Sequence, residues 1–129
     1  MTSYKSYFFL CILGSIGLIN SCSYTEFAQG KRLYERHCGD CHMNDGSGVV
    51  KLYPSLINST KMQVSTLPCI IRYGQKSNNT VVEMEGIPDL SEVEINNIIN
   101  YLLNDLTSSN QVINMPDTKR ILEQCGTDQ

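Results

Sequence analysis

Apolar residues recur at helical spacing in two segments, one in each half of the chain. In the first segment, Ser23-Tyr24-Thr25-Glu26 has the pattern of a capping box, which predicts a helix from there to about Arg36. The apolar stripe of this helix consists of Phe27, Gly30, Leu33 and Tyr34. A glycine inside a helix costs about 1 kcal/mol relative to alanine. Because Gly30 nevertheless lies on the apolar stripe, we expect it to mark a close helix crossing.

The second segment has the clearest helical pattern in the chain. Ser91-Glu92-Val93-Glu94 is another capping box, and Leu90 and Ile95 occupy the hydrophobic-staple positions around it. The stripe that follows consists of Ile95, Ile98, Ile99, Leu102 and Leu106, with Tyr101 beside it. The pattern therefore predicts a helix that reaches Leu106.

Shorter elements are predicted between and after these helices. Residues 66–74 indicate a short helix, with Pro68 in its first turn and Gly74 at its end. Residues 43–48 are typical of a turn-rich loop, and residues 81–88 form an irregular apolar segment. A last helix of one or two turns is predicted over 117–125. No strand is predicted, so the expected fold class is all-α with three to five helices.

The first 21 residues resemble an export signal. Lys5 gives a positive start, and the apolar run that follows is about thirteen residues long, too short to span a bilayer comfortably. The run ends in Ile19-Asn20-Ser21-Cys22, which resembles the bacterial lipoprotein box. This resemblance implies cleavage before Cys22, lipidation of that cysteine, and a protein anchored on the periplasmic side of a bacterial membrane. The alternative is an ordinary signal peptide with a coincidental cysteine.

Composition narrows the class of protein. A chain of 129 residues suits one modest domain, and a net charge of -3 without any run of Lys or Arg excludes a nucleic-acid footprint. Trp is absent and aromatic residues make up only 8% of the chain. The core made by protein side chains is therefore thin, and a large apolar cofactor would help to fill it.

The candidate chemistry centres on Cys38-Gly39-Asp40-Cys41-His42. On a helical turn this spacing puts both thiols on one face, with an imidazole directly after the second. C-x-x-C-H is the attachment signature of c-type haem, so we expect one covalent haem c, with thioether bonds from Cys38 and Cys41 and His42 as an iron ligand. A structural zinc module is a weaker alternative, because such sites usually draw on a second ligand pair, which the chain lacks.

The order of the predicted elements resembles that of a class I monohaem cytochrome c over residues 24–106. The resemblance implies a small all-α cytochrome c fold wrapped around one covalently bound haem. It also implies that the first helix crosses the last one, with Gly30 and Tyr34 meeting Tyr101. We therefore expect a signal peptide over 1–21, a cytochrome c domain over 22–106 and a C-terminal extension over 107–129.

The resemblance also assigns the environment of the iron. It implies that the carbonyl of Pro54 accepts the ring N–H of His42, and that Met84 is the sixth ligand. Met62 is the second choice for this ligand. His37 is expected to be solvated or packed, because neighbouring helical residues do not face the same side. Filling both axial sites favours electron transfer over catalysis, so no enzyme activity is expected.

Two cysteines, Cys69 and Cys125, depart from the family pattern. They are the two cysteines that remain after those of the N-terminal segment and of the haem motif are set aside. In an exported protein such an even number favours a disulfide, which would tie the extension back to the middle helix. Two free buried thiols are the alternative.

The expected function is single-electron transfer between membrane-associated respiratory redox proteins, such as respiratory complexes or reductases, by a monomer. The alternative is a fixed electron-transfer subunit of a terminal oxidase or of a periplasmic reductase complex.

Overall fold

The computed structural model describes residues 27–57, 59–60, 62–76 and 82–125. The predicted signal, Cys22 and the capping box over 23–26 lie outside these residues. The elements, in chain order, are α2 (Ala28–His37), α3 (Gly39–His42), α4 (Leu67–Tyr73), β1 (Gly74–Gln75), β2 (Met84–Glu85), α5 (Glu92–Tyr101), the π-helical turn η2 (Leu102–Leu106) and α6 (Met115–Cys125). The protein has the small, mostly helical fold that the sequence predicts.

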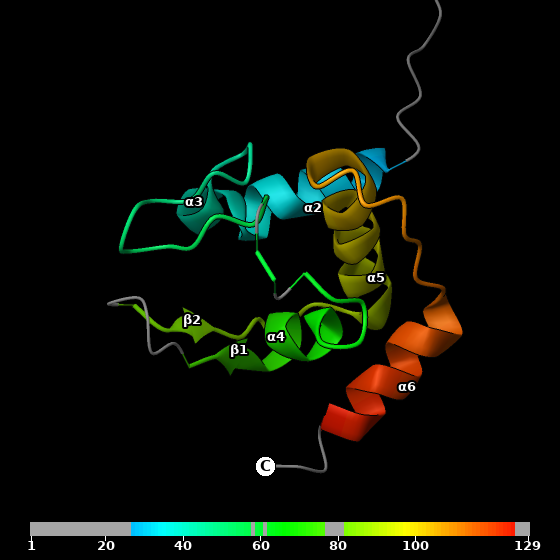
Figure 1. Cartoon of the computed structure of the whole chain (residues 1–129). Coiled ribbons are helices and arrows are strands. Elements are labelled where there is room, and N and C mark those ends of the chain that lie inside the picture. Colours follow the sequence, from blue (N-terminus) through cyan, green and yellow to red (C-terminus); the bar gives the residue numbers. More distant parts are fainter. Residues whose placement is uncertain (1–26, 58, 61, 77–81, 126–129) are drawn as a thin grey trace, which may run out of the picture.

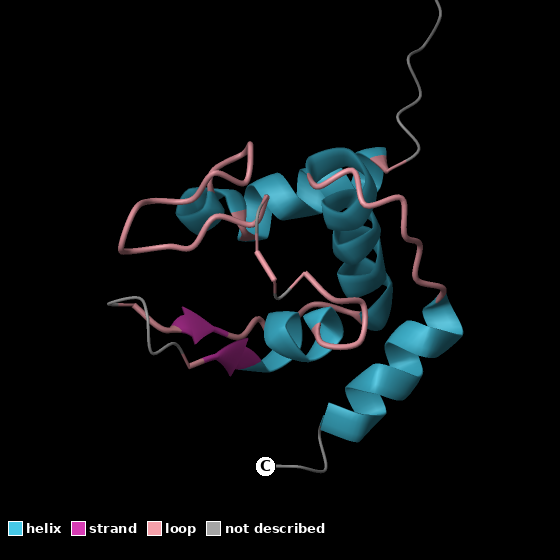
Figure 2. Ribbon diagram, viewed as in Figure 1, coloured by secondary structure: helices cyan, strands magenta, loops and turns pink. Residues whose placement is uncertain are grey.

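On one side of the fold, called the open side below, no described helix connects the upper elements to the lower ones. Figure 1 shows α2 and α3 above, α4 and the ribbon β1–β2 below, and α5 connecting the two levels on the right, so that the open side is on the left. Figure 2 shows that the two short strands lie on the same open side as α3 and its loop. The fold thus carries the C-x-x-C-H turn and the Met84 segment on two facing arms.

The crossing of α2 and α5 is the centre of the core. A Cβ atom added to Gly30 would lie 2.1 Å from the carbonyl oxygen of Asn97 and 2.7 Å from the Cβ of Tyr101. The rings of Tyr34 and Tyr101 pack beside this contact, with centroids 5.4 Å apart. The predicted close crossing at Gly30 is confirmed, because no larger side chain fits between the two backbones.

Helix α5 begins as its sequence predicts. The Ser91 hydroxyl accepts the N–H of Glu94 at 3.3 Å, and the Glu94 carboxylate accepts the N–H of Ser91 at 2.8 Å, which completes the capping box. The apolar stripe after this cap is buried, with Ile95, Ile98 and Ile99 fully enclosed. Burial of this stripe fixes which face of the helix turns toward α2 and α4.

The end of this helix differs from the prediction, because residues 102–106 form a π-helical turn. The N–H of Thr107 donates to the carbonyl of Leu102 at 3.0 Å, and the side-chain amide of Asn104 donates to the carbonyl of Asn100 at 2.9 Å. A side chain that takes a backbone carbonyl competes with the regular helical hydrogen bond and can widen the helix locally.

The prediction of no strand is wrong, since β1 and β2 form a two-stranded antiparallel ribbon. Gly74 ends α4 at a φ of 81°, and a Cβ there would lie 2.2 Å from the carbonyl oxygen of Met84. The ribbon depends on this close approach between distant segments. Two-residue strands are also too short to show an alternating pattern in the sequence.

The C-terminal segment packs against the rest of the fold. Helix α6 contacts α4 and α5, and Ile113, Ile121 and Leu122 are buried. It starts at Met115, two residues before the predicted boundary. A disulfide joins Cys69 on α4 to Cys125 at the end of α6, with the Cα atoms 5.8 Å apart.

Buried asparagine side chains also hold this segment. The Asn100 amide group donates to the carbonyl of Ile113 at 3.0 Å and accepts its N–H at 2.9 Å. Asn96 donates to the same carbonyl and to the Thr118 hydroxyl, both at 2.9 Å. These bonds give the backbone around Ile113 the partners that it lacks outside regular structure. Within the described ranges, no helix is long and apolar enough to cross a membrane.

Candidate haem site

The two thiols lie on one tight turn that follows α2. The N–H of Cys38 donates to the carbonyl of Tyr34 at 2.8 Å, and the N–H of His42 donates to the carbonyl of Cys38 at 2.9 Å. Both Cys38 and Cys41 are free thiols and half-buried. Burial, with a smaller effect from the neighbouring Cys41, raises the pKa of Cys38 to about 12. The Cys38 sulfur is therefore a neutral thiol at pH 7, before any bond to a cofactor is made.

His42 is buried and oriented by the loop that follows it. Its Nδ1 atom lies 3.1 Å from the carbonyl oxygen of Pro54. Since a carbonyl can only accept, Nδ1 carries a proton, and in the neutral ring the lone pair is then on Nε2. No other hydrogen bond of the His42 ring occurs within the described residues. The ring is thus held in the tautomer that binds a metal through Nε2.

The loop from Met43 to Pro54 folds back because a glycine permits it. The N–H of Gly48 donates to the carbonyl of His42 at 3.0 Å. Gly48 has a φ of 67°, and a Cβ there would lie 2.5 Å from the carbonyl oxygen of Tyr53. This left-handed turn returns the chain to the histidine, so that Pro54 meets the ring.

Tyr34 supports the same turn through a hydrogen bond. Its buried hydroxyl donates to the carbonyl of Met43 at 2.7 Å, directly after His42. Burial raises the pKa of Tyr34 well above its usual range, and the nearby Cys38 and Tyr101 act in the same direction. The hydroxyl therefore stays protonated and keeps donating in the folded protein at alkaline pH.

We expect Tyr34→Phe to lower the free energy of unfolding by about 1 kcal/mol at pH 7, because the Met43 carbonyl loses its donor. Above pH of about 10 the difference from wild type should shrink. In that range Tyr34 ionises in the unfolded chain but not in the folded one. This ionisation lowers the free energy of unfolding of wild type, and the phenylalanine variant has no such loss. Urea unfolding at both pH values measures the effect. Tyr53→Phe, whose hydroxyl makes no hydrogen bond among the described residues, is the control; a difference that grows with pH would contradict the assignment.

Met84 lies on the opposite arm of the open side. It is half-buried on β2 and pairs directly with Gln75 on β1. Residues that face each other in an antiparallel pair project from the same face of the sheet. Met84 and Gln75 therefore share one face of the ribbon.

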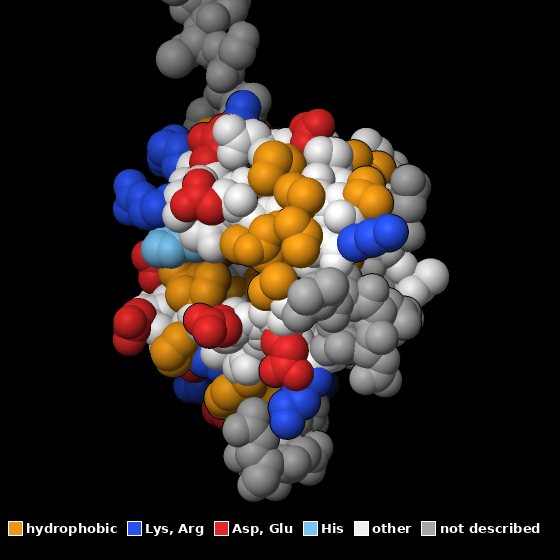
Figure 3. Space-filling model, turned by 90° about the vertical axis from the view of Figure 1, so that its left-hand side faces the viewer, with side chains coloured by type: hydrophobic (Ala, Val, Ile, Leu, Met, Phe, Trp, Pro, Cys, Tyr) orange, Lys and Arg blue, Asp and Glu red, His pale blue; other side chains and the backbone are white. Residues whose placement is uncertain are grey.

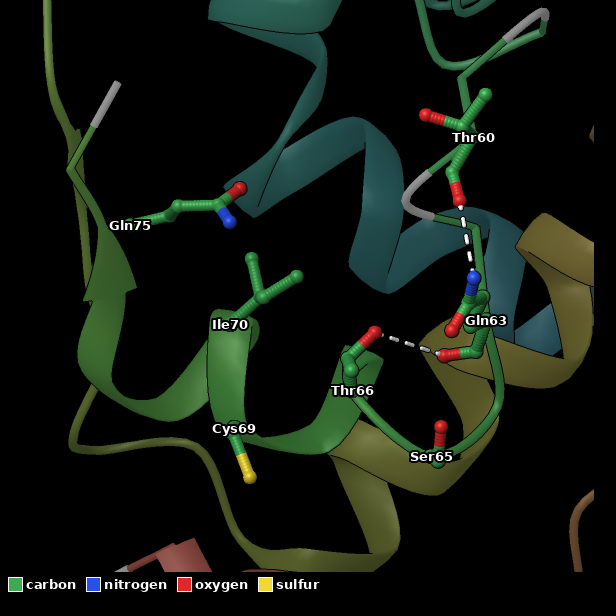
Figure 4. A pocket seen from close by; sticks show the side chains of 7 residues that line it. All are labelled: Thr60, Gln63, Ser65, Thr66, Cys69, Ile70 and Gln75. Carbon is green, nitrogen blue, oxygen red and sulfur yellow. Dashed lines mark hydrogen bonds between the residues drawn. The ribbon is translucent and has the colours of Figure 1, made fainter. Parts of the chain in front are cut away.

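The direction of that face follows from a pocket of about 390 Å³ beside α4. Figure 4 shows Ile70 and Gln75 pointing into it, on the side of α4 that faces α2 and α3, while Cys69 points away toward α6. Its lining consists of Thr60, Gln63, Ser65, Thr66, Cys69, Ile70 and Gln75. The pocket does not touch the C-x-x-C-H turn, so it marks only the lower wall of the open side.

Met62 has a different environment. It packs against the hydrophobic core and lines a second pocket, of about 460 Å³, on the side of α6. Gln63 and Ser65 line both pockets, so the segment around them separates the α6 side from the open side. Met62 therefore lies on the α6 side of this segment, whereas Met84 lies on the ribbon β1–β2. His37, at the end of α2, is exposed, as the sequence predicts.

The donor set on the two arms fits a haem c. It offers two free thiols one turn apart, an imidazole with a bare Nε2, and a thioether on the facing ribbon. Figure 3 shows hydrophobic side chains gathered on the open face, with charged side chains around them. The described residues contain no group of three or more His, Cys, Asp or Glu side chains that could hold a metal ion, so the zinc alternative has no support among them.

Comparison with known proteins gives the family. No curated protein matches the sequence. Residues 25–102, more than half of the chain, match the family described as cytochrome C oxidase, cbb3-type, subunit III. The match supports a cytochrome c domain that carries electrons, whereas class I membership and the lipoprotein signal stay predictions. The chain belongs to this family, and its cytochrome c domain binds a covalent haem c with its iron.

Proposed function

We propose that the protein is a single-electron carrier, with the haem attached to Cys38 and Cys41 and its iron held by His42 and Met84. The haem supplies an iron that gains and loses one electron. The observation that carries the proposal is the 3.1 Å contact between His42 Nδ1 and the Pro54 carbonyl, which leaves Nε2 free for a metal. A histidine that served only to pack the core would not require an Nε2 atom without a hydrogen-bond partner.

The residues of the chain suit transfer without catalysis. Pro54 orients the His42 ring, and Met84 lies on β2, which pairs with the strand that directly follows α4. With an imidazole and a thioether as axial ligands, no open position would be left for a substrate. A soft thioether also favours ferrous iron and raises the reduction potential.

We expect Met84→Ala to abolish the far-red absorption band that a methionine sulfur gives with ferric iron. The change removes the sulfur from the face of the ribbon that Gln75 shares. Absorption spectra of the oxidised proteins measure this. The matched control is Met62→Ala, which should keep the band, since Met62 packs on the α6 side. Loss of the band in Met62→Ala, with survival in Met84→Ala, would reverse the assignment.

We further propose that the protein is exported and anchored through lipidated Cys22 on the periplasmic side of a bacterial membrane. The support is the Ile19-Asn20-Ser21-Cys22 box after an apolar run. The mass of the N-terminal peptide of the mature protein tests the proposal. An unmodified peptide, or one that begins upstream of Cys22, would refute it.

The family description favours one alternative partner. It names a subunit of a cbb3-type oxidase, so the chain could pass electrons within a fixed respiratory complex rather than as a free monomeric carrier. Purification from native membranes in mild detergent separates these two functions. Stable co-elution with an oxidase would favour the fixed subunit, and elution as a monomer would favour the free carrier.

A further inference from the structure

The ribbon β1–β2 holds a second polar side chain beside the proposed sulfur ligand. Gln75 lies directly opposite Met84, and directly opposed residues on one face have Cβ atoms about 5 Å apart. Both side chains are long and half-buried. The amide of Gln75 is therefore within reach of the Met84 sulfur.

The register of this pair is fixed from both ends. A Cβ at Gly74 would lie 2.2 Å from the Met84 carbonyl oxygen, and one at Gly86 would lie 2.5 Å from the Arg72 carbonyl oxygen. The N–H of Ile87 also donates to the carbonyl of Ile71 on α4 at 2.9 Å. With these contacts on either side, a slip of the ribbon by one residue would create clashes at both glycines, so Gln75 and Met84 stay paired.

The hydrogen bonds of the two glutamines that line the pocket differ. The Gln63 amide donates to the carbonyl of Thr60 at 3.4 Å, whereas the Gln75 amide makes no hydrogen bond within the described residues. Figure 4 shows the Gln75 side chain reaching into the space above Ile70. An amide in this position has an N–H available for a ligand sulfur on the same face of the ribbon.

We propose that Gln75 is a positioning residue for the sulfur ligand, and that in the haem-loaded protein its side-chain N–H donates to Sδ of Met84. A thioether sulfur has two lone pairs, and it is a weak acceptor. A hydrogen bond to one lone pair holds the side chain in the orientation that leaves the other for the iron. Such a partner of a ligand controls how firmly the ligand stays bound. The inference rests on the proposed haem ligation by His42 and Met84.

The test is displacement of Met84 by added imidazole in the oxidised, haem-loaded full chain. The loss of the far-red band measures this displacement. Without the hydrogen bond, Met84 leaves the iron more easily. Gln75→Leu should therefore lower the apparent Kd for imidazole about five-fold, which corresponds to one ordinary hydrogen bond. Gln63→Leu removes the same amide from the same pocket, where it is already bonded to Thr60. It should stay within about two-fold of wild type.

The outcomes separate the two proposals. A wild-type protein without the far-red band would overturn both the ligation by Met84 and the role of Gln75. A wild-type band that Met84→Ala removes, together with an unchanged Kd in Gln75→Leu, would overturn the role of Gln75 alone. Equal shifts in Gln75→Leu and Gln63→Leu would also overturn it, because they would report a general loosening of the pocket. Thermal unfolding of each variant checks that the fold is intact.

Discussion

Replacing Gly30 by alanine is expected to lower the free energy of unfolding by about 3 kcal/mol, a severe loss for a small domain. The added Cβ would meet the carbonyl oxygen of Asn97 at 2.1 Å and the Cβ of Tyr101 at 2.7 Å. The first of these is a backbone atom of α5, so relief requires that the two helices separate. Separation would also part Tyr34 from Tyr101, whose rings pack beside the crossing.

Guanidinium unfolding of the haem-loaded protein, followed by far-ultraviolet circular dichroism, measures this loss. Gln29→Ala is the matched control, because it places the same methyl group on the exposed side of α2. It should change the free energy of unfolding by less than about 0.5 kcal/mol. If Gly30→Ala were as mild as this control, the helices could not be in the contact described.

Removing the disulfide by replacing Cys69 and Cys125 with alanine should lower the free energy of unfolding by about 4 kcal/mol. The bond closes a loop between residues 56 positions apart, and the main effect is on the entropy of the unfolded chain. Helix α6 should stay docked in the folded protein, because the Asn96 and Asn100 hydrogen bonds are independent of the disulfide.

Denaturant unfolding of the oxidised protein and of the double variant measures this effect. Cys125→Ala alone is the control, and it should lose nearly as much as the double variant, since either change removes the bond. Alkylation of the unreduced, unfolded protein gives an independent check. Two added alkyl groups, or an unchanged unfolding midpoint in the double variant, would show that the bond does not form.

Local patterns predicted the parts of the fold that depend on neighbours in the chain. The capping box at Ser91 and the stop at Gly74 follow from residues a few positions apart, and both are present. The close crossing at Gly30 was also predictable, because a glycine weakens a helix and its place on the apolar stripe points to a contact that offsets this cost. The contact of Pro54 with His42 was expected only from the resemblance to cytochromes c.

Features that depend on distant contacts were missed. The ribbon β1–β2 exists because Gly74 and Gly86 let two segments approach, and nothing in the local pattern of either segment indicates a strand. The π-helical turn was also missed, although its cause is local: the side chain of Asn104 donates to the carbonyl of Asn100, four residues earlier. Asparagine is neutral to unfavourable inside helices. Helix propensity therefore did not indicate that asparagine side chains of this helix would bond to the C-terminal extension.

One signal for the docked extension was present in the sequence. Asn96, Asn100 and Asn104 recur every four residues on a helix whose other face is strongly apolar. Such a polar row usually faces solvent. Here the side chains of Asn96 and Asn100 are buried, and they bond the backbone around Ile113. A row of uncharged amides beside a core stripe is therefore a usable sign of a covering segment.

The measurement that bears most directly on the proposed function is an optical redox titration of the purified protein. With a haem attached at Cys38 and Cys41 and ligated by His42 and Met84, the spectrum should show a Soret band throughout. It should also show a far-red band that disappears on reduction, along a single reversible one-electron curve. A protein without Soret absorption, or one whose oxidised iron shows no methionine band, would contradict the proposed His42–Met84 site.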